Sequence, residues 1–406
     1  MPGFRLFYGD KMVTVAAAKP ILEKSIKKVE KWVEDNNYRG YDPADGLTSY
    51  LRTLTFGSLF LDRVLLQLVQ RSPINLRRLF GIKPLDSFVG RGYMARGYLI
   101  MLKITGNEEY KDKAEACLNF LKNNKAPGFE HYSWGKMFDF ASRGGRYRIF
   151  EPITVWTSLI GQAFLDAYEI IGSGEYLDIA CSICEWILER PRNQTDSGSC
   201  INYTAFGEGG CTIHNQSMLG AAMLARTAKF SGKSEYLKVA KEVITYTCTR
   251  QLSDGSWYYG EAPIYHWIDN FHTGYNLDAL KCYMESTNDK TYEDNLRKGF
   301  NFFKNNFFEL GGRPKYYHNR TYPADSQCAS QAVETLANFA DCDEASLELG
   351  LKVARWTIAN MQDRAGYFYF RQYPFITLKV PMIHWAQATT YHALALLLLK
   401  IASNSI

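Results

Sequence analysis

The chain has 406 residues, of which 46% are hydrophobic and 22% charged, so it can bury a large core and does not have the composition of a disordered chain. Lysine and arginine number 47 against 42 aspartate and glutamate, and a net charge of +5 is too small and dispersed for a dedicated nucleic-acid binder. Aromatic residues reach 15%, and so many amphipathic rings suit a sugar-binding cleft as well as a core.

The nine cysteines are scattered and odd in number, unlike the even disulfide framework of small secreted domains. Cys181 and Cys184 form a CxxC pattern inside an amphipathic helical segment, and we interpret them as buried apolar residues rather than zinc ligands. The N-terminus lacks a signal-peptide pattern, and the longest apolar run, 393–399, is too short to cross a bilayer. The sequence therefore predicts a cytoplasmic protein without a membrane span, a metal or a cofactor.

Residues 1–18 are expected to form an N-terminal extension, and residues 19–406 a single domain. The first predicted helix covers 21–34 and has no preceding partner helix. Four apolar residues mark one side of this helix: Ile21, Ile26, Val29 and Val33. A further helix is predicted near 48–69, followed by a small basic cluster at 71–78 that we interpret as ordinary surface.

The rest of the chain repeats one unit at intervals of about 60 residues: an aromatic glycine-rich loop, a helix of small residues, a short turn and a charged amphipathic helix. The small-residue helices are predicted to begin near Tyr93, Thr154, His214, His272, Asp325 and His384. Such a hairpin cannot bury its apolar face alone, so the copies must stack into an open superhelix or a closed ring.

The two ends of the chain favour a ring. The C-terminal helix predicted over 384–400 has no following partner, just as the helix over 21–34 has no preceding one, and pairing the two would close the circle. We therefore predict an all-α fold, an (α/α)6 or (α/α)7 toroid with short strands in its rim loops. The helix near 48–69 leaves the number of hairpins open.

Two loops, 251–257 and 362–368, share the pattern Q-x3-G-x-aromatic, which resembles the QW motif of the terpene cyclase and prenyltransferase toroids. A structural role explains the pattern, because the glutamine can tie a helix end, the glycine turns the chain and the ring packs over the turn. The DxDD acid motif of terpene cyclases is absent, so a terpenoid cyclase is only a remote alternative.

In such a toroid the starts of the inner helices converge on one end. His214, His272 and His384 occupy equivalent starts, and an imidazole beside a helix N-terminus stays neutral and available as a base near pH 7. A purely structural hydrogen-bonding role is the alternative for each histidine. Asp325 begins another inner helix, and Asp269 lies just before His272, where it can also serve as the helix cap.

The segment 254–275 is the richest in carboxylates, histidines and rings, as expected of a cleft that fixes a ligand by polar contacts on stacking surfaces. The predicted substrate-binding residues are Trp257, Tyr259, Glu261, Trp267, Arg313, Tyr322, Arg371 and Trp385.

Five segments together resemble the polysaccharide biosynthesis family typified by VpsJ: 41–47, 71–76, 213–215, 254–260 and 267–275. The resemblance runs from about residue 40 to the C-terminus, and 267–275 is its most specific part. It implies a role in extracellular or capsular polysaccharide production but assigns no reaction. At the level of fold, the chain also resembles N-acylglucosamine 2-epimerases, glucuronyl C5-epimerases and unsaturated glucuronyl hydrolases.

The leading hypothesis is an enzyme of polysaccharide biosynthesis or modification that abstracts a proton from a sugar or uronic acid unit, as epimerases and lyases do. The base would be His272 or His214, the acid Tyr317 or His384, and the charge partner Arg313 or Arg371.

Two alternatives stay open. A glycoside hydrolase needs paired carboxylates, and Asp269 with Asp325 or with Glu261 would supply them. A non-catalytic toroid would bind a glycan or act as a scaffold for polysaccharide synthesis machinery. In each case the predicted partner is a sugar, oligosaccharide or polysaccharide, and not a nucleic acid.

Overall fold

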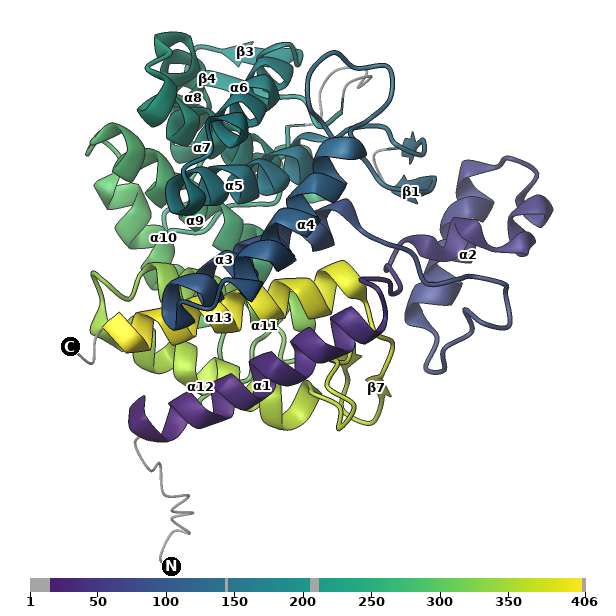
Figure 1. The fold of residues 1–406 in the computed structure, drawn as a ribbon. Helices are drawn as coiled ribbons and strands as arrows, with labels where there is room; N and C mark the ends of the chain where they lie inside the picture. The colour runs from purple at the N-terminus through teal and green to yellow at the C-terminus, as the bar shows by residue number, and fades with distance from the viewer. Residues whose placement is uncertain (1–14, 143–144, 205–211, 404–406) are drawn as a thin grey trace, which may run out of the picture.

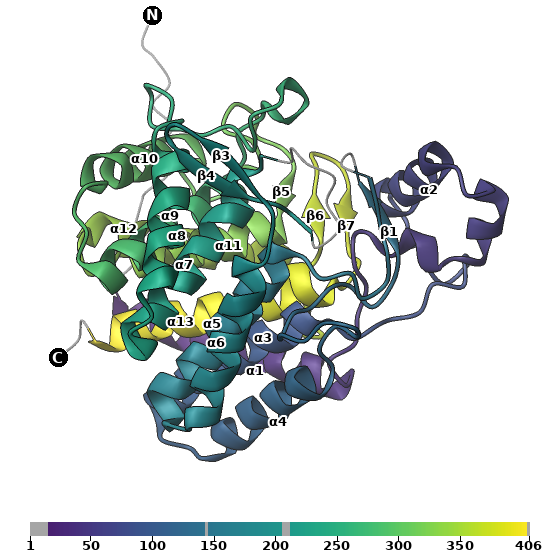
Figure 2. The same cartoon turned by 90° about the horizontal axis from the view of Figure 1, so that it is seen from above.

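The structure is a computed structural model that describes residues 15–142, 145–204 and 212–403. Two sets of helices alternate along the chain and form two concentric layers (Figures 1 and 2). The inner helices are α3 (Phe88–Thr105), α5 (Thr154–Ile171), α7 (His214–Ser231), α9 (Asn270–Thr287), α11 (Ser326–Asn338) and α13 (Thr389–Ser403). The outer helices are α4 (Glu109–Asn123), α6 (Gly174–Leu188), α8 (Ser234–Cys248), α10 (Glu293–Asn306), α12 (Glu344–Met361) and α1 (Val15–Asp35).

The composition of each helix explains its layer. Helix α7 contains four alanines and one glycine and is buried on nearly all sides, and its small side chains let its neighbours approach closely. Helix α10 is amphipathic: its first turn carries Glu293 and Asp294, while Phe300, Phe302 and Phe303 are buried. Such a helix fits only the outer layer, with one face on the core and one in water.

The inner helices pack in chain order, and the ring closes because α13 contacts both α11 and α3. Helix α1 becomes the outer partner of α13 and contacts α12, so the first and last helices form the closing pair. On its other side α1 meets α4, where Lys113 Nζ lies 2.9 Å from Glu30 Oε1. The predicted all-α toroid is confirmed, with six helix pairs in the described residues.

The helix expected near 48–69 does not form a seventh pair. It is a 3-10 helix, η2 (Tyr50–Thr55), followed by α2 (Leu59–Arg71), and both lie outside the ring. Residues 49–84, here called the lobe, project beside the ring in both views (Figures 1 and 2). The side chain of Arg77 fixes its base, with Nε 2.8 Å from Asp45 Oδ2 in a pair that is almost fully buried.

The predicted helix starts agree with the structure at Thr154 and His214, and α9 and α11 begin next to their predicted starts. Helix α3 begins earlier, at Phe88. His384 lies in a π-helical segment, Ile383–Ala388, that leads into α13. One detail of α1 was wrong: Ile21 is exposed, and Leu22 joins Ile26, Val29 and Val33 on the buried side.

Short antiparallel strands occur in the loops that lead from an outer helix to the next inner helix, as predicted. They are β1 (Phe140–Ser142), β2 (Gly145–Tyr147), β3 (Arg192–Thr195), β4 (Gly198–Ile201), β5 (Ala324–Asp325), β6 (Arg371–Gln372) and β7 (Thr377–Leu378). In the three-stranded sheet β5-β6-β7, Asp325 pairs with Arg371.

The structural interpretation of the two QW-like loops is confirmed. Gln251 Nε2 donates to the carbonyls of Gly255 and of Asn295 on the next outer helix, both at 2.9 Å. Gln362 does the same with Gly366 at 2.9 Å and Ser25 at 3.2 Å. Each glycine has a positive φ and lies so close to the neighbouring helix backbone that a Cβ would clash with it. The motif thus joins successive outer helices.

Candidate functional site

The rim of the ring is held by pairings between neighbouring loops at the residues just before the inner helices. Isolated β-bridges join Ile153 to Thr204, Ile213 to Gly260 and Asp269 to Tyr317. The β5–β6 pairing of Asp325 with Arg371 continues this belt. Because these equivalent positions are tied together, the N-termini of α5, α7, α9 and α11 meet at one end of the ring.

His272 and Asp269 form a hydrogen-bonded pair at the start of α9. Asp269 is the N-cap of this helix, and its Oδ1 accepts the backbone N–H of His272 at 3.0 Å. Its Oδ2 lies 2.7 Å from His272 Nδ1 and 2.9 Å from Trp267 Nε1, so both of its oxygens face donors. The carboxylate of Asp269 therefore both caps helix α9 and orients the imidazole of His272.

Aromatic rings surround this pair. Tyr259 stacks on Trp267 with ring centroids 4.6 Å apart and lies 4.4 Å from the imidazole of His272. Phe271 makes edge contacts with Trp385 at 6.0 Å and with Tyr316 at 5.8 Å. The loops before α9, α11 and α13 thus contribute one continuous group of rings, the type of surface on which sugar rings stack.

Arg371 and Asp325 form the charged part of the same group. Asp325 caps α11 by accepting the backbone N–H of Gln327 at 2.9 Å, and its other oxygen is ion-paired with Arg371 Nε. The guanidinium lies 5.1 Å from the centre of the Tyr316 ring, which Tyr317 contacts at 4.7 Å. The predicted residues Tyr317 and Arg371 therefore contact the rings around His272, and Asp325 is joined to them through its ion pair with Arg371.

His384 lies next to this group and lines a narrow crevice of about 450 Å³ including open solvent. Its ring stacks on Trp385 at 4.4 Å, and its Nε2 has no hydrogen-bond partner in the described part of the chain. Burial lowers the pKa of His384 to about 3; the Asp42 charge opposes this shift and the Lys136 charge adds to it, so the imidazole is neutral in the native protein.

The crevice also contains Asp42 and Lys136, whose Oδ1 and Nζ lie 2.5 Å apart. Burial raises the pKa of Asp42, but Lys136 outweighs it and holds the carboxyl below its usual range. Lys136 also lies 5.1 Å from the centre of the Trp156 ring. The sequence analysis missed these residues, although Asp42 belongs to the segment 41–47 that it quoted.

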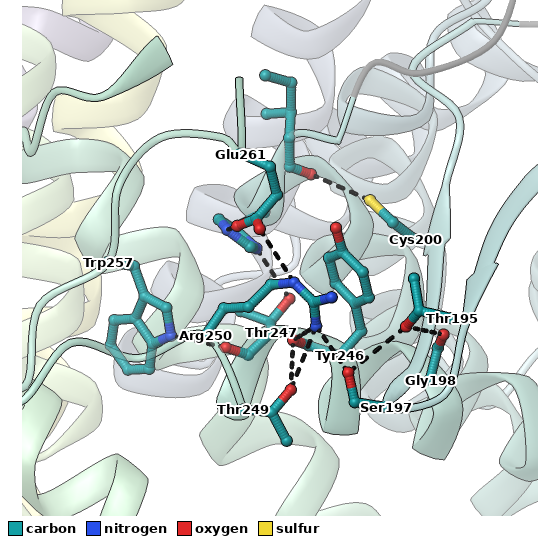
Figure 3. A network of polar contacts seen from close by, with 12 residues as sticks. Thr195, Ser197, Gly198, Cys200, Tyr246, Thr247, Thr249, Arg250, Trp257 and Glu261 are labelled. Carbon is teal, nitrogen blue, oxygen red and sulfur yellow. Dashed lines mark hydrogen bonds and ion pairs between the residues drawn. The ribbon is translucent and has the colours of Figure 1, made fainter. Parts of the chain in front are cut away.

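His214 is engaged on both ring nitrogens. Its Nε2 lies 2.8 Å from Glu261 and its Nδ1 3.4 Å from Thr247, and the residue is 1% exposed. Glu261 also pairs with Arg250 at 3.1 Å, and Figure 3 shows Arg250 continuing this network toward Ser197. The hydrogen bond from His214 lowers the pKa of Glu261, with the Arg250 charge assisting. This network fixes the loop on α7 and α8, and a catalytic role of His214 stays a prediction.

Other predicted residues lie away from the rings around His272. Trp257 is buried, with Nε1 donating to the carbonyl of Thr247 at 3.0 Å, so it belongs to the core (Figure 3). Arg313 donates to the hydroxyl of Tyr322 at 2.7 Å and covers its ring, forming a separate pair on the loop before α11.

A second cavity, of about 1080 Å³ including open solvent, lies between the inner helices toward their C-terminal ends. Arg96 joins two of its walls through ion pairs with Asp166 at 2.8 Å and Glu334 at 3.3 Å. Asp278 accepts hydrogen bonds from Gln331 and from other side chains of α11. Burial, with the nearby Glu334 charge, raises the pKa of Asp278 to about 7.

Cys184 is buried and Cys181 half-buried on α6, and both are free thiols. In residues 15–142, 145–204 and 212–403, no group of three or more His, Cys, Asp or Glu side chains is arranged to hold a metal ion. Over the same residues, no helix has both the length and the apolar character needed to cross a membrane.

A scan against protein-family models finds no match, and neither does a search of curated proteins. Solved structures do match. A cellobiose 2-epimerase from Bacillus thermoamylovorans has a TM-score of 0.61 and 11% identity, over 78% of this chain and 88% of that chain. A GH76 α-mannanase from Bacteroides thetaiotaomicron has a TM-score of 0.60 and 12% identity, over 78% and 87%. An unsaturated glucuronyl hydrolase specific for heparin has a TM-score of 0.61 and 10% identity, over 96% and 98%.

Likenesses at such low identity show the fold and not the reaction. Membership of the polysaccharide biosynthesis family stays a prediction, because no family comparison supports it. The chain has an (α/α) toroid fold, which it shares with epimerases and glycoside hydrolases that act on carbohydrates.

Proposed function

We propose that this protein is a carbohydrate-active enzyme of polysaccharide biosynthesis or modification that moves a proton on a sugar or uronic acid unit, as an epimerase or lyase does. The observation that carries this proposal is the His272–Asp269 pair at the rim, with a separation of 2.7 Å between Nδ1 and Oδ2. A carboxylate bonded to Nδ1 fixes the imidazole tautomer and stabilises the cation that forms when the ring takes a proton.

His272 is the group best placed to act as the base. Because Nδ1 donates to Asp269, the lone pair of the neutral ring is on Nε2, which makes no hydrogen bond within the described residues. The His272 side chain is 19% exposed, so a ligand can reach it, whereas Asp269 is fully buried. The rings of Tyr259 and Trp267 beside it offer a face on which a sugar can stack.

Removing a proton beside a carbonyl or carboxylate leaves negative charge on oxygen, and this charge needs a donor or a cation nearby. Arg371 contacts the same ring group and carries a permanent charge. His384, kept neutral by burial, can donate a hydrogen bond to an oxygen without first carrying a charge. We assign base to His272, and charge stabilisation to Arg371 and His384.

The hydrolase alternative is less well supported by the carboxylates. An inverting or retaining glycosidase needs one carboxylic acid that holds its proton at working pH. Asp269 is surrounded by donors, and Asp325 is ion-paired with Arg371. Glu261 has a lowered pKa because it bonds His214, which is the wrong direction for a general acid.

The test is incubation in deuterated water with a panel of neutral and uronic-acid oligosaccharides, read by mass and proton spectra. Deuterium at a ring carbon supports epimerisation, and an absorbing double bond supports elimination. A new reducing end formed with addition of water and without a double bond supports the hydrolase instead, and saturable binding without any product supports a glycan-binding scaffold.

The matched variants are His272→Ala and His131→Ala. His131 is a partly exposed histidine on the α4–α5 connection, where it contacts Ser182. The proposal requires that His272→Ala abolishes whichever product the unmodified protein forms, the deuterated sugar or the double bond, while its melting temperature stays near that of the unmodified protein. Full product formation by His272→Ala, or equal losses in both variants, would overturn the assignment of the base.

A further inference from the structure

The lobe, residues 49–84, exposes an unusual number of apolar side chains. Ten of the large hydrophobic residues exposed in the described chain lie in it, against seven elsewhere. Those more than half exposed and without a polar group are Leu54, Phe56, Phe60, Leu68, Ile74 and Leu79. Phe56 is 86% and Phe60 71% exposed. Exposed apolar side chains gathered in one segment in this way indicate a place where another molecule docks.

Helix α2 carries two apolar faces. Leu65, Leu66 and Val69 are buried against the base of the lobe. Phe60, Val64 and Leu68 follow one another at intervals of four residues on the other side and face outward. This outward apolar face of α2 has no partner within the described chain.

The charged residues of the lobe are almost all basic. Its basic residues are Arg52, Arg63, Arg71, Arg77, Arg78 and Lys83, and its one acidic residue is Asp62. Asp62 is 1% exposed and ion-paired with Arg146, and Arg77 is buried with Asp45. The exposed apolar side chains are therefore bordered by cations, with no exposed carboxylate among residues 49–84.

We infer that the lobe docks peripherally on a membrane surface that contains anionic lipids. Amphipathic helices with phenylalanine and leucine on one face and arginine or lysine beside it bind at this interface, with the apolar face among the acyl chains and the cations at the headgroups. Phe56, Phe60 and Leu68 enter the apolar layer, while Arg63 and Arg71 contact lipid phosphates.

The same observations disfavour a second copy of the chain. A two-fold interface would place the same surface against itself and bring the cations of both copies together without carboxylates to offset them. The lobe also projects from the ring (Figures 1 and 2), and a projecting face suits a lipid surface better than a peptide, which binds in a groove.

Docking through the lobe would place the rim near the lipids. The crevice that contains His384 is lined partly by Lys83 and Leu85, at the end of the lobe, and Arg52 pairs with Asp139 of the neighbouring rim loop at 2.6 Å. The inference does not depend on the reaction proposed above, because it rests on the exposed residues of the lobe alone.

The test is co-sedimentation of the full chain with vesicles of phosphatidylcholine, alone or mixed with phosphatidylglycerol. We expect binding to the mixed vesicles that weakens as salt rises and is far weaker without the anionic lipid. The double variant Phe56→Ser, Phe60→Ser should bind at least about tenfold more weakly, because two apolar anchors are lost. Arg63→Glu with Arg71→Glu should also lose about tenfold.

Leu310→Ser is the matched control, because Leu310 is 99% exposed on the α10–α11 connection, away from the lobe. It should bind as the unmodified protein does, and melting curves should show all variants folded. Absence of binding by the full chain, or equal binding by Phe56→Ser, Phe60→Ser, would overturn the inference. A dimer that this double variant dissociates, without vesicle binding, would identify a second copy as the occupant and overturn it too.

Discussion

Nδ1 of His272 lies 2.7 Å from Oδ2 of Asp269, while the other oxygen of Asp269 accepts the backbone N–H of the same histidine. One carboxylate therefore starts helix α9 and orients the imidazole that we propose as the base. The two roles can be separated by substitution, because asparagine caps a helix nearly as well as aspartate but carries no charge.

Asp269→Asn should lower kcat by about a hundredfold or more on the substrate that the panel identifies, because the imidazolium loses its carboxylate and the tautomer is no longer fixed. The melting temperature should fall by only a few degrees. Steady-state kinetics and thermal melts measure both. A large loss of stability with unchanged kcat would show that Asp269 serves the fold alone.

Because of His384, the free energy of unfolding should decrease as the pH falls. Its pKa is about 3 in the folded chain and about 6.5 when exposed, so between these values the unfolded state binds the extra proton. Its contribution to stability is complete above pH 6.5 and is lost as pH falls, by at most about 1.4 kcal/mol per pH unit. Urea unfolding should show that the free energy of unfolding of His384→Gln changes less between pH 4 and pH 7 than that of the unmodified protein. His266→Gln, at an exposed histidine, should not.

Because of Asp278, the free energy of unfolding should decrease as the pH rises, opposite to the effect of His384. Its folded pKa of about 7 lies above its ordinary value of 3.8, so the native state holds the proton in that window. Its contribution is present in acid and is lost as pH rises toward 7. The charged groups that face it are Glu334, which favours the proton, and Lys281, which opposes it. The free energy of unfolding of Asp278→Asn should therefore rise relative to that of the unmodified protein when the pH is raised from 5 to 8. Urea unfolding at both pH values measures this difference.

Much of the ring could be predicted from the sequence, because its features are local and repeated. Small-residue helices alternate with charged amphipathic ones, and a helix without a partner stands at each end, so stacking and closure follow. The position of Asp269 one residue before α9 likewise predicts its cap and its proximity to His272.

The parts that could not be predicted depend on contacts between distant segments or on the direction of a side chain. Nothing in residues 41–47 indicates that Asp42 lies in one crevice with His384. The start of α7 is correctly placed, yet the ring of His214 turns to Glu261 and Thr247. Ile21 and Leu22 differ by one helical step, which decides which of them is buried.

Arg371→Met should destabilise the protein by about 3–5 kcal/mol, because it leaves Asp325 buried without its cation. The control is Lys290→Met, at an exposed pair whose atoms lie 3.9 Å apart and which should contribute less than about 1 kcal/mol. Chemical denaturation compares the two. Equal, small effects would mean that water compensates Asp325 in the variant.

The ring closes where α12 packs against α1. Gln362 joins α12 to α1, since its Nε2 donates to the carbonyl of Ser25 and its Oε1 accepts the Ser25 hydroxyl at 2.9 Å. Gln251 makes the equivalent link from α8 to α10 within the continuous part of the chain. Each alanine variant should lose about 1–3 kcal/mol from unpaired backbone groups.

Hydrogen exchange separates the two positions. In Gln362→Ala the amides of α1 should lose protection before the rest of the ring, because α1 is held to α12 without a covalent connection nearby. In Gln251→Ala the amides of α1 should keep their protection. Equal exchange of α1 in both variants would show that packing of α1 on α13, and not this glutamine, holds the first helix to the last.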